Sequence, residues 1–569
     1  MKKTSIKLLA VLMVLTLIVA GCGSKNDNNS ASSGSGSASG NNSAGEAGGN
    51  GSGKSGIVLT EPGSMKVSEE KVTLKVMVGA KIEGDYNTNW FTQWLEEQTN
   101  VHVEWEVVPK DSMKEKLNLA LASGDYPDVI MNMKINLTQQ QLYGSQGIFL
   151  PLNELIEEHG VETKKALAAI EDKDQYYALD GNIYSLPSFN DCYHCNRDQK
   201  LWIYKPWLDK LNLEMPQTTE QLYEVLKAFK EQDPNGNGKA DEIPYAGAVK
   251  DWHSSVHNFL MNAFIFTDTK NQFKFTYLQD GQVDIIVNKP EFKEGLTYMR
   301  KLYQEGLIAP ETFTQKREQL RQLGDGKGDP ILGAFPSGWM ASATYLDGES
   351  GRWLEYVTVP ALEGPNGTRY AGFGPYSGII HGDFIITDKA KHPEVAMRWG
   401  DNFFREDVML RALYGKEGEH WRYAQDGEKG INGEPAKYVI LERSKPEENI
   451  IWDQSMPSVR TAEFRLGEGI TEPETNLEYI LYHESKNNYD PYVPDKSMIL
   501  PPLLFSKEQS SELLDLQTTL DNYMEEMIAK FIIGQANIEA EWDAYLKTLD
   551  NMKLERYLGI LQEAYDSRY

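Results

Sequence analysis

The chain has 569 residues, and 57 Lys plus Arg stand against 84 Asp plus Glu, for a formal net charge of −27. This length predicts about two or three domains, and 40% hydrophobic with 25% charged residues is typical of an ordinary soluble globular protein. Because the acidic balance would repel a phosphate backbone, nucleic acid is excluded as the expected ligand.

The N-terminus has the pattern of a lipoprotein signal peptide over residues 1–21. Its first residues are rich in lysine, and residues 8–19 form an apolar run too short to span a membrane comfortably. Ala20-Gly21-Cys22 follows and resembles the lipobox of bacterial lipoproteins, in which the signal is cut before a cysteine that carries diacylglycerol. An ordinary secretory signal with an incidental cysteine is the alternative. We expect Cys22 to be lipidated, so that acyl chains such as palmitate anchor the protein to the outer face of the cytoplasmic membrane.

Residues 22–61 predict a flexible tether. From about residue 24 to residue 56 nearly every residue is Gly, Ser, Asn or Ala, a composition that cannot bury enough apolar surface to order itself. Gly48 to Ser55 match the phosphate-loop pattern G-x-x-x-x-G-K-[ST] letter for letter. That loop requires a buried strand before it and a helix after it, and neither flank has hydrophobic periodicity. We therefore do not predict an ATPase.

Strands and helices alternate after the tether. The predicted elements are a strand at 72–79, a helical stretch at 90–95, a strand at 101–108, a helix at 110–123 and a short apolar segment at 128–132. This order predicts a mainly parallel sheet covered on both faces. Trp90 and Trp94 share one helical stripe, which favours a core role over a ligand-binding role.

A second group of elements begins after Pro187. Thr218 and Gln221 make a predicted capping box for a helix that runs directly into the stretch 233–244. From about Glu508 to the end the pattern is almost entirely helical. No internal repeat is apparent.

Several stretches occur in a characteristic order. Besides the lipobox and the tether, they are residues 85–103, 121–129, 184–187, 201–211 and 391–399. Their order resembles that of the extracellular solute-binding lipoproteins of ABC importers, specifically the carbohydrate-binding group that includes the alginate-binding proteins. The resemblance implies an α/β fold of the type II periplasmic-binding-protein kind: two lobes, each an α/β sheet with flanking helices, a ligand enclosed between them and a helical C-terminus.

The family's pattern implies lobe boundaries and a function. Lobe 1 would take residues 62–189 and 377–450, and lobe 2 would take residues 190–376 and 451–569. The implied protein is a monomeric receptor that captures an oligosaccharide by lobe closure and delivers it to the membrane subunits of an ABC importer. It would not be an enzyme. The alternatives are a secreted carbohydrate-active enzyme, such as a lyase or glycosidase, and a receptor for peptides or another solute.

The stretch 233–244 is similar to an EF-hand calcium loop. Positions 1, 3, 5, 6 and 7 are occupied by Asp233, Asn235, Asn237, Gly238 and Lys239. Position 12 requires a bidentate Glu and is Pro244 here. Asp241 and Glu242 are the available substitutes, as in the alginate-binding relatives that this loop resembles. We expect a structural calcium ion, and a Gly/Asn-rich turn without an ion is the alternative.

Sugar rings present apolar C–H faces ringed by hydroxyls, so we expect ligand contacts from aromatic and planar polar side chains at the lobe edges. The candidates are Asp85, Tyr86, Asn87, Trp252, Trp339, Tyr376 and Trp452. Trp339 and Tyr376 are favoured because each lies in a glycine-flanked stretch. For Trp252 and Trp452 a core role is the alternative, and the three residues 85–87 could instead cap a helix.

Lipidation of Cys22 would leave one cysteine pair, Cys192 and Cys195. Their spacing suits redox chemistry, a metal or a local disulfide, and a disulfide is the simplest expectation outside the cell. Zinc would need two further ligands, and only His194 is near. His253 and His257 have the spacing of a zinc-binding helix without its catalytic Glu, and we interpret them as surface histidines.

Overall fold

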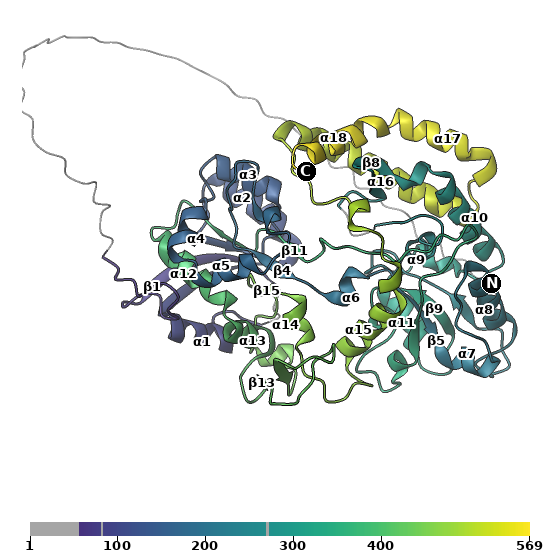
Figure 1. The fold of residues 1–569 in the computed structure, drawn as a ribbon, viewed down its shortest axis with the longest axis horizontal. Helices are drawn as coiled ribbons and strands as arrows, with labels where there is room; N and C mark the ends of the chain where they lie inside the picture. Colours follow the sequence, from purple (N-terminus) through teal and green to yellow (C-terminus); the bar gives the residue numbers. More distant parts are fainter. Residues whose placement is uncertain (1–55, 81–83, 269–271) are drawn as a thin grey trace, which may run out of the picture. The chain divides into compact units, whose positions relative to one another are not determined.

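A computed structural model of the protein describes residues 56–80, 84–268 and 272–569 (Figure 1). The predicted signal peptide, the lipidation site Cys22 and nearly all of the tether lie outside the described residues. Residues 55–569 form one compact unit by their internal contacts. Within the described ranges, no helix has both the length and the apolar character needed to cross a membrane.

The first sheet has four strands in the order β12-β3-β1-β2. Its strands are β1 (Val72–Gly79), β2 (Val101–Val108), β3 (Val129–Met131) and β12 (Phe384–Ile386). β1 is parallel to β2 and β3, and β12 is antiparallel to β3. Successive side chains of a strand point to opposite faces of the sheet. Val76 and Val78 therefore belong to one hydrophobic core, which we call the first core, and Met77 belongs to another core on the opposite face. The predicted sheet, covered on both faces, is confirmed.

Helix α1 (Trp90–Thr99) packs on the first sheet and shows how local sequence sets its ends. The side chain of Asn89 accepts hydrogen bonds from the backbone N–H groups of Phe91 and Thr92, and Asn100 ends the helix with a φ of 60°. Phe91 is fully buried, and Trp90 and Trp94 are partly buried against the first core. The core role predicted for the two tryptophans is confirmed.

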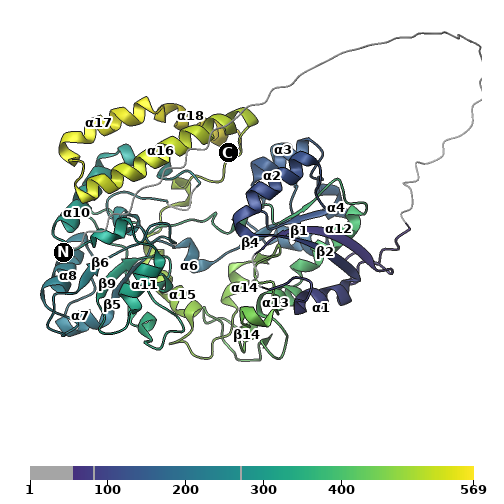
Figure 2. The same cartoon turned by 180° about the vertical axis from the view of Figure 1, so that it is seen from behind.

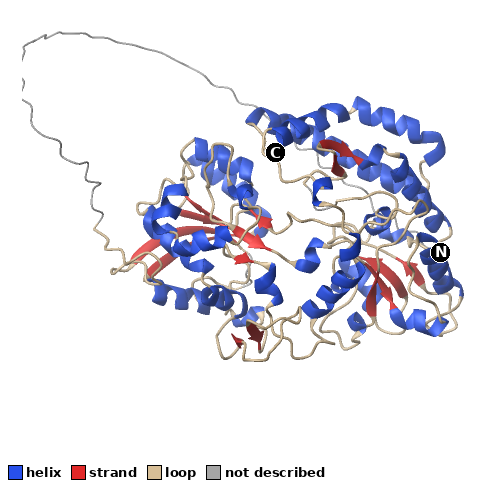
Figure 3. Cartoon of the chain, viewed as in Figure 1, coloured by secondary structure: helices blue, strands red, loops and turns tan. Residues whose placement is uncertain are grey.

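The second sheet has the order β10-β5-β9-β6. Its strands are β5 (Leu201–Tyr204), β6 (Ile243–Tyr245), β9 (Leu332–Pro336) and β10 (Tyr356–Val359). Only β6 and β9 pair in parallel; the other two pairs are antiparallel. Figure 3 shows the strands of the two larger sheets as separate groups, each flanked by helices. This mixed α/β architecture, in which the two larger sheets pack in separate cores, confirms the predicted fold class.

Helix α8 (Thr219–Glu231) begins as predicted at Thr218, whose hydroxyl accepts a hydrogen bond from the Gln221 N–H at 3.2 Å. The reciprocal half of the predicted capping box is absent at this helix. The Gln221 side chain instead accepts from the N–H of Gln217 at 2.7 Å. The helix therefore has a single side-chain cap, and it ends beside the stretch 233–244 as expected.

A small third sheet connects the two cores. Its strands are β4 (Ser188–Asn190), β11 (Ile379–Ile380) and β15 (Val459–Arg460), in the order β11-β4-β15. The chain passes from the first core to the second between Leu186 and Leu201 and returns between Ala371 and Phe384. It passes to the second core again after Phe464. We call this sheet the connecting sheet.

The two cores also bear on the lobe boundaries. The second core takes its side chains from residues 201–371 and from residue 481 onward. Three side chains of the segment 451–464, which the sequence-based division assigned to lobe 2, pack in the first core: Trp452, Met456 and Phe464. We therefore propose that lobe 2 resumes after Phe464.

The C-terminal helices cover the second core. α16 (Lys507–Ile533), α17 (Ile538–Asn551) and α18 (Leu554–Asp566) contribute side chains to it, and α16 runs beside α10 (Pro290–Gln304), as Figures 1 and 2 show. The predicted helical C-terminus is confirmed. The remaining α-helices are α2 (Met113–Ser123), α3 (Leu137–Ser145), α4 (Asn153–His159), α5 (Val161–Ala168), α6 (Tyr193–Asn196), α7 (Lys205–Leu211), α9 (Val256–Met261), α11 (Arg317–Asp325), α12 (Pro393–Asp401), α13 (Glu406–Tyr414), α14 (Ala462–Leu466) and α15 (Leu477–Asn488). The remaining strands form two hairpins, β7 (Thr276–Gln279) with β8 (Gln282–Ile285) and β13 (Trp421–Tyr423) with β14 (Tyr438–Ile440).

Candidate functional site

Two of the predicted ligand residues, Trp252 and Trp339, lie together. Their ring centroids are 6.3 Å apart and the planes meet at 70°. Trp252 follows β6 and Trp339 follows β9, and because these strands are parallel neighbours, both residues lie beyond the same edge of the second sheet. Ligands of α/β sheets commonly bind at this carboxyl edge. The indole Nε1 of Trp339 is buried and donates to no acceptor among the described residues.

A cavity of 800 Å³ opens beside Trp252. This volume is within the range of roughly 300–1,000 Å³ that is typical of small-molecule sites. Its wall combines apolar and polar groups from the loop after β6, the stretch before β7 and helix α16; they include Trp252, His253, Lys274, Phe275 and Glu525. The mixture suits a ligand with apolar faces and hydroxyl edges.

Two buried carboxylates, those of Asp251 and Asp198, hold the loop that carries Trp252. Arg317 donates from Nε to Asp251 at 2.6 Å, and the Ser254 hydroxyl donates to the same carboxylate at 2.7 Å. Burial raises the pKa of Asp251, but these hydrogen bonds outweigh it and the pKa lies below its usual value. Asp198 and His253 form a second pair at 3.0 Å. Sequence reasoning missed the acidic partners because they are far from their bases in the chain.

Tyr376 lies at a different cavity. It lines a space of 180 Å³ together with His381 and Leu500, and the Nζ of Lys496 is 5.1 Å from the centre of its ring. Asp268 lines both this cavity and the one beside Trp252. The structure therefore brings Trp252 and Trp339 together and leaves Tyr376 apart from them.

The candidates from the first lobe divide into two groups. Tyr86 and Trp452 are buried in the first core: Tyr86 stacks on Trp105 at 4.7 Å, and Trp452 donates from Nε1 to the Thr92 hydroxyl at 2.8 Å. For Trp452 this is the core role kept as the alternative. Asp85 and Asn87 are exposed and bond to each other, with the Asp85 carboxylate accepting from the Asn87 N–H at 2.9 Å. Neither caps α1, which is capped by Asn89.

The EF-hand-like loop brings four of its six predicted ligand residues together: Asp233, Asn235, Asn237 and Asp241. The Asp233 carboxylate accepts from the N–H groups of Asn237 and Gly238 at 3.1 and 3.0 Å, as in a tight Asx-type turn. Asn235 and Asn237 both donate from their side-chain amides to Asp241, at 2.9 and 3.2 Å. The hydrogen bond from Asn235 is the main cause that lowers the pKa of Asp241.

Glu242 supplies the test of fit for a cation in this loop. Its Oε1 atom is buried and accepts no hydrogen bond from any described residue. A buried carboxylate oxygen without a partner is costly, and a hard divalent cation would satisfy it. The donor set is all oxygen, which calcium prefers, so the residues present fit calcium.

Cys192 and Cys195 form a disulfide across α6. His194 lies beside it, with Nε2 3.7 Å from the Cys195 sulfur. Because the two sulfurs bond to each other, they do not act as zinc ligands in this state. The interpretation of His253 and His257 as surface residues is wrong: the His253 side chain is only 9% exposed, and both residues line the cavity beside Trp252.

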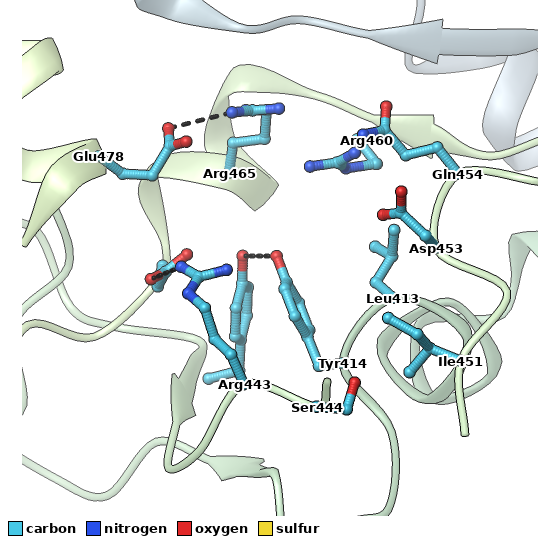
Figure 4. A pocket seen from close by; sticks show the side chains of 12 residues that line it. Leu413, Tyr414, Arg443, Ser444, Ile451, Asp453, Gln454, Arg460, Arg465 and Glu478 are labelled. Atoms are coloured by element: carbon cyan, nitrogen blue, oxygen red, sulfur yellow. Dashed lines mark hydrogen bonds and ion pairs between the residues drawn. The ribbon is translucent and has the colours of Figure 1, made fainter. Parts of the chain in front are cut away.

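A second polar cavity lies at the connecting sheet (Figure 4). Arg460 from β15, Arg465 from α14 and Glu478 from α15 line it, and Arg465 pairs with Glu478 at 3.0 Å. None of these residues was singled out from the sequence, because isolated arginines carry no motif.

Comparison with known proteins decides the family. The family model described as "Bacterial extracellular solute-binding protein" matches residues 79–409, more than half of the chain. The chain belongs to this family. The resemblance predicted from the order of motifs is thereby confirmed.

Individual solute-binding proteins cover more of the chain. It is 29% identical over 518 residues to the fructooligosaccharide ABC transporter substrate-binding protein FusA of Streptococcus pneumoniae, covering 88% of this chain and 91% of FusA. The structure of FusA with kestose aligns with a TM-score of 0.71 at 27% identity, over 87% of this chain and 99% of that one. A FusA EF-hand mutant in complex with fructo-nystose aligns with a TM-score of 0.70 at 27% identity, with the same coverage. The alginate-binding protein AlgQ2, solved without calcium ion, shares the fold with a TM-score of 0.64 at 24% identity, over 89% of this chain and all of that one.

Proposed function

We propose that this protein is the oligosaccharide receptor of an ABC importer and that the ligand binds against Trp252 and Trp339. The observation that carries the proposal is the pair of tryptophans at one sheet edge, next to a cavity of 800 Å³. Its support outside the structure is the similarity over most of the chain to a substrate-binding protein for fructooligosaccharides.

The chemistry of the pair suits a sugar. An indole face packs against the apolar C–H face of a pyranose or furanose, and the Nε1–H of Trp339, which has no acceptor in the described part of the chain, would donate to a hydroxyl. His253, held by Asp198, and Lys274 offer further polar contacts at the cavity wall. We expect the lobes to close on the ligand by bending at the connecting sheet.

Calorimetry with the purified protein tests this function. A panel of neutral oligosaccharides, peptides and small acids is titrated into the wild type and into Trp252→Ala. We expect one class of oligosaccharide to bind and the variant to lose at least tenfold in affinity. The control Tyr423→Ala removes an aromatic ring that is 43% exposed and lines none of the three cavities described above, and it should bind normally. Binding of peptides alone would overturn the proposal.

We also propose that the protein binds without chemical conversion. Its relatives are solute-binding proteins, which supports a receptor rather than a lyase or glycosidase. Chromatography of the sugar after long incubation with the protein should return it intact. Appearance of shortened or unsaturated products would establish the enzymatic alternative.

Calcium in the loop 233–244 is a further part of the proposal. Asp233, Asn235, Asn237 and the carbonyl of Lys239 would hold it together with Asp241 and Glu242, and its role would be to fix the end of α8. The buried oxygen of Glu242, which has no hydrogen-bond partner among the described residues, supports the site. The structure of a FusA EF-hand mutant is a second line of support, because it indicates that this relative has an EF-hand.

We further propose a lipid anchor at Cys22 on the outer face of the cytoplasmic membrane and a monomeric receptor. The lipobox sequence supports the anchor, and the family consists of extracellular proteins. Mass spectrometry of the mature N-terminus should detect a diacylglyceryl cysteine, and Cys22→Ala should release the protein into the medium. Retention of that variant at the membrane would count against the anchor.

A further inference from the structure

The cavity at the connecting sheet has a volume of 280 Å³, enough for one small group rather than an oligomer. Its wall is built from residues before and after Phe464, where the chain passes from the first core to the second for the last time. Tyr414 ends α13 and Arg460 lies in β15, and Glu478 lies in the first turn of α15. Figure 4 shows Tyr414, Arg460 and Arg465 pointing toward the same space.

Arg460 is the unusual member of this wall. It is 7% exposed, yet its Nε and Nη1 atoms have no hydrogen-bond acceptor anywhere in the described ranges. Burial is the main cause that lowers its pKa. Its backbone is fixed in the connecting sheet, since its carbonyl accepts from the Asp191 N–H at 2.9 Å. A buried guanidinium with open donors is costly unless an acceptor fills the space in front of it.

The other two arginines of the cavity are already compensated. Arg465 pairs with Glu478 at 3.0 Å and also donates to the Asn190 side chain at 2.8 Å. Arg443 is 64% exposed to solvent, and it lies 3.4 Å from Glu468. Asp453, the third acid on the wall, is exposed and forms no ion pair with Arg460 among the described residues. The cavity therefore holds one buried guanidinium, that of Arg460, with two nitrogens that find no acceptor among the residues described.

Neutral donors lie on the same wall. The Ser444 hydroxyl is buried and has no hydrogen-bond partner in the described part of the chain. The Tyr414 hydroxyl bonds only weakly to that of Tyr438, at 3.3 Å. These hydroxyls add neutral hydrogen-bonding capacity to the wall of the cavity that Arg460 lines.

We infer that this cavity binds a single carboxylate group, held by the open fork of Arg460. A guanidinium matches a carboxylate with two parallel hydrogen bonds, and one negative charge balances the one uncompensated arginine. A dianion would bring a second negative charge close to the three acidic side chains of the wall, Asp453, Glu468 and Glu478, and is therefore disfavoured. The carboxylate can belong to an acidic sugar unit or to a free small acid, and the inference does not require the oligosaccharide function proposed above.

Calorimetry in low-chloride buffer tests the site with D-galacturonate, acetate and their neutral counterpart D-galactose. We expect both carboxylates to bind saturably, and D-galactose at least tenfold more weakly than D-galacturonate. Tighter binding of D-galacturonate than of acetate would identify a sugar acid as the source, and equal binding a free small acid. Failure of both carboxylates to bind, or equal binding of D-galactose or chloride, would overturn the inference.

Variants locate the binding. Arg460→Gln should lose at least tenfold in affinity for the carboxylates, and Arg460→Lys should also bind more weakly because the fork is lost. Arg556→Gln, which changes a surface arginine on α18, is the matched control. If Arg460→Gln does not fold, as judged by circular dichroism, Tyr414→Phe replaces it and should weaken binding several-fold. Unchanged affinity in the folded variants would place the carboxylate elsewhere. Neutral-oligosaccharide binding that survives in Arg460→Gln separates this site from the one at Trp252.

Discussion

Gly338 lies against the face of Trp252: a β-carbon added at residue 338 would come within 2.7 Å of the indole ring. The N–H of Gly338 also donates to the Trp252 carbonyl at 3.3 Å. Only a residue without a side chain allows this approach of backbone to ring, so the position of the candidate sugar platform depends on a glycine.

Gly338→Ala should therefore displace Trp252 and weaken oligosaccharide binding about tenfold, the equivalent of roughly 1.4 kcal/mol of steric cost. Calorimetric titration measures the affinity, and tryptophan fluorescence reports the changed ring environment. Gly559→Ala is the control, because a β-carbon there meets nothing within 4 Å and the residue lies in helix α18. Normal affinity in Gly338→Ala would remove Trp252 from the site.

Substitution of Trp452 tests whether this residue stabilises the first core or binds the ligand. It is fully buried and meets Phe91 edge-on at 4.9 Å. Trp452→Ala should lower the free energy of unfolding by about 3–5 kcal/mol, because it leaves a large cavity in the first core. Urea unfolding measures the loss. The affinity of the folded fraction for oligosaccharide should not change, and a selective loss of binding at normal stability would return Trp452 to the ligand site.

Glu468 predicts a pH dependence of stability. Burial is the main cause that raises its pKa to about 7. The folded state holds this proton more tightly than the unfolded state. The contribution of Glu468 to the free energy of unfolding is therefore complete below the pKa of the unfolded state, and it is lost as pH rises through 7. The loss should be on the order of 2–3 kcal/mol between pH 5 and pH 8.

Glu468→Gln, which mimics the protonated acid, should flatten this decline in urea-unfolding measurements from pH 5 to pH 8. Glu447→Gln, at an exposed position of the same region, should keep the wild-type slope. If Glu468→Gln and the wild type lose stability in parallel, the decline arises from another group.

Calcium removal tests the EF-hand-like loop. A chelator should lower the melting temperature, and calcium at 100 times its dissociation constant should restore about 2.7 kcal/mol. Asp241→Asn should abolish this response, whereas Asp426→Asn, at an exposed position elsewhere, should retain it. A melting curve that chelator leaves unchanged, together with no calcium by elemental analysis, would exclude the site.

Local patterns predicted the parts of the fold that are local in origin. The alternation in residues 72–79 and the cap at Thr218 are set by neighbouring residues, and both elements form there. The second sheet was not predicted to be mainly antiparallel, because its pairing depends on strands far apart in the chain, such as β5 and β10.

The candidate site was predictable in part for the same reason. Trp339 could be chosen as an aromatic residue next to a glycine and Trp252 as an aromatic residue in a polar stretch, and the two lie together. Tyr86 occurs in an equally polar stretch, yet it is buried by Trp105 from the neighbouring strand, a contact that sequence spacing does not reveal. Arg460 lines a cavity together with residues from α13 and α15, so the proposed site could be recognised only in three dimensions.

The discontinuous first sheet has a consequence for biogenesis. β12, at Phe384–Ile386, pairs with β3, at Val129–Met131, and completes a sheet whose other strands are made much earlier. A chain that emerges from its N-terminus therefore exposes an unpaired edge of β3 while residues 201–371 of the second core emerge. The first sheet begins early but is completed only after this long insertion, so assistance from extracytoplasmic chaperones would matter most in the interval between the emergence of β3 and of β12.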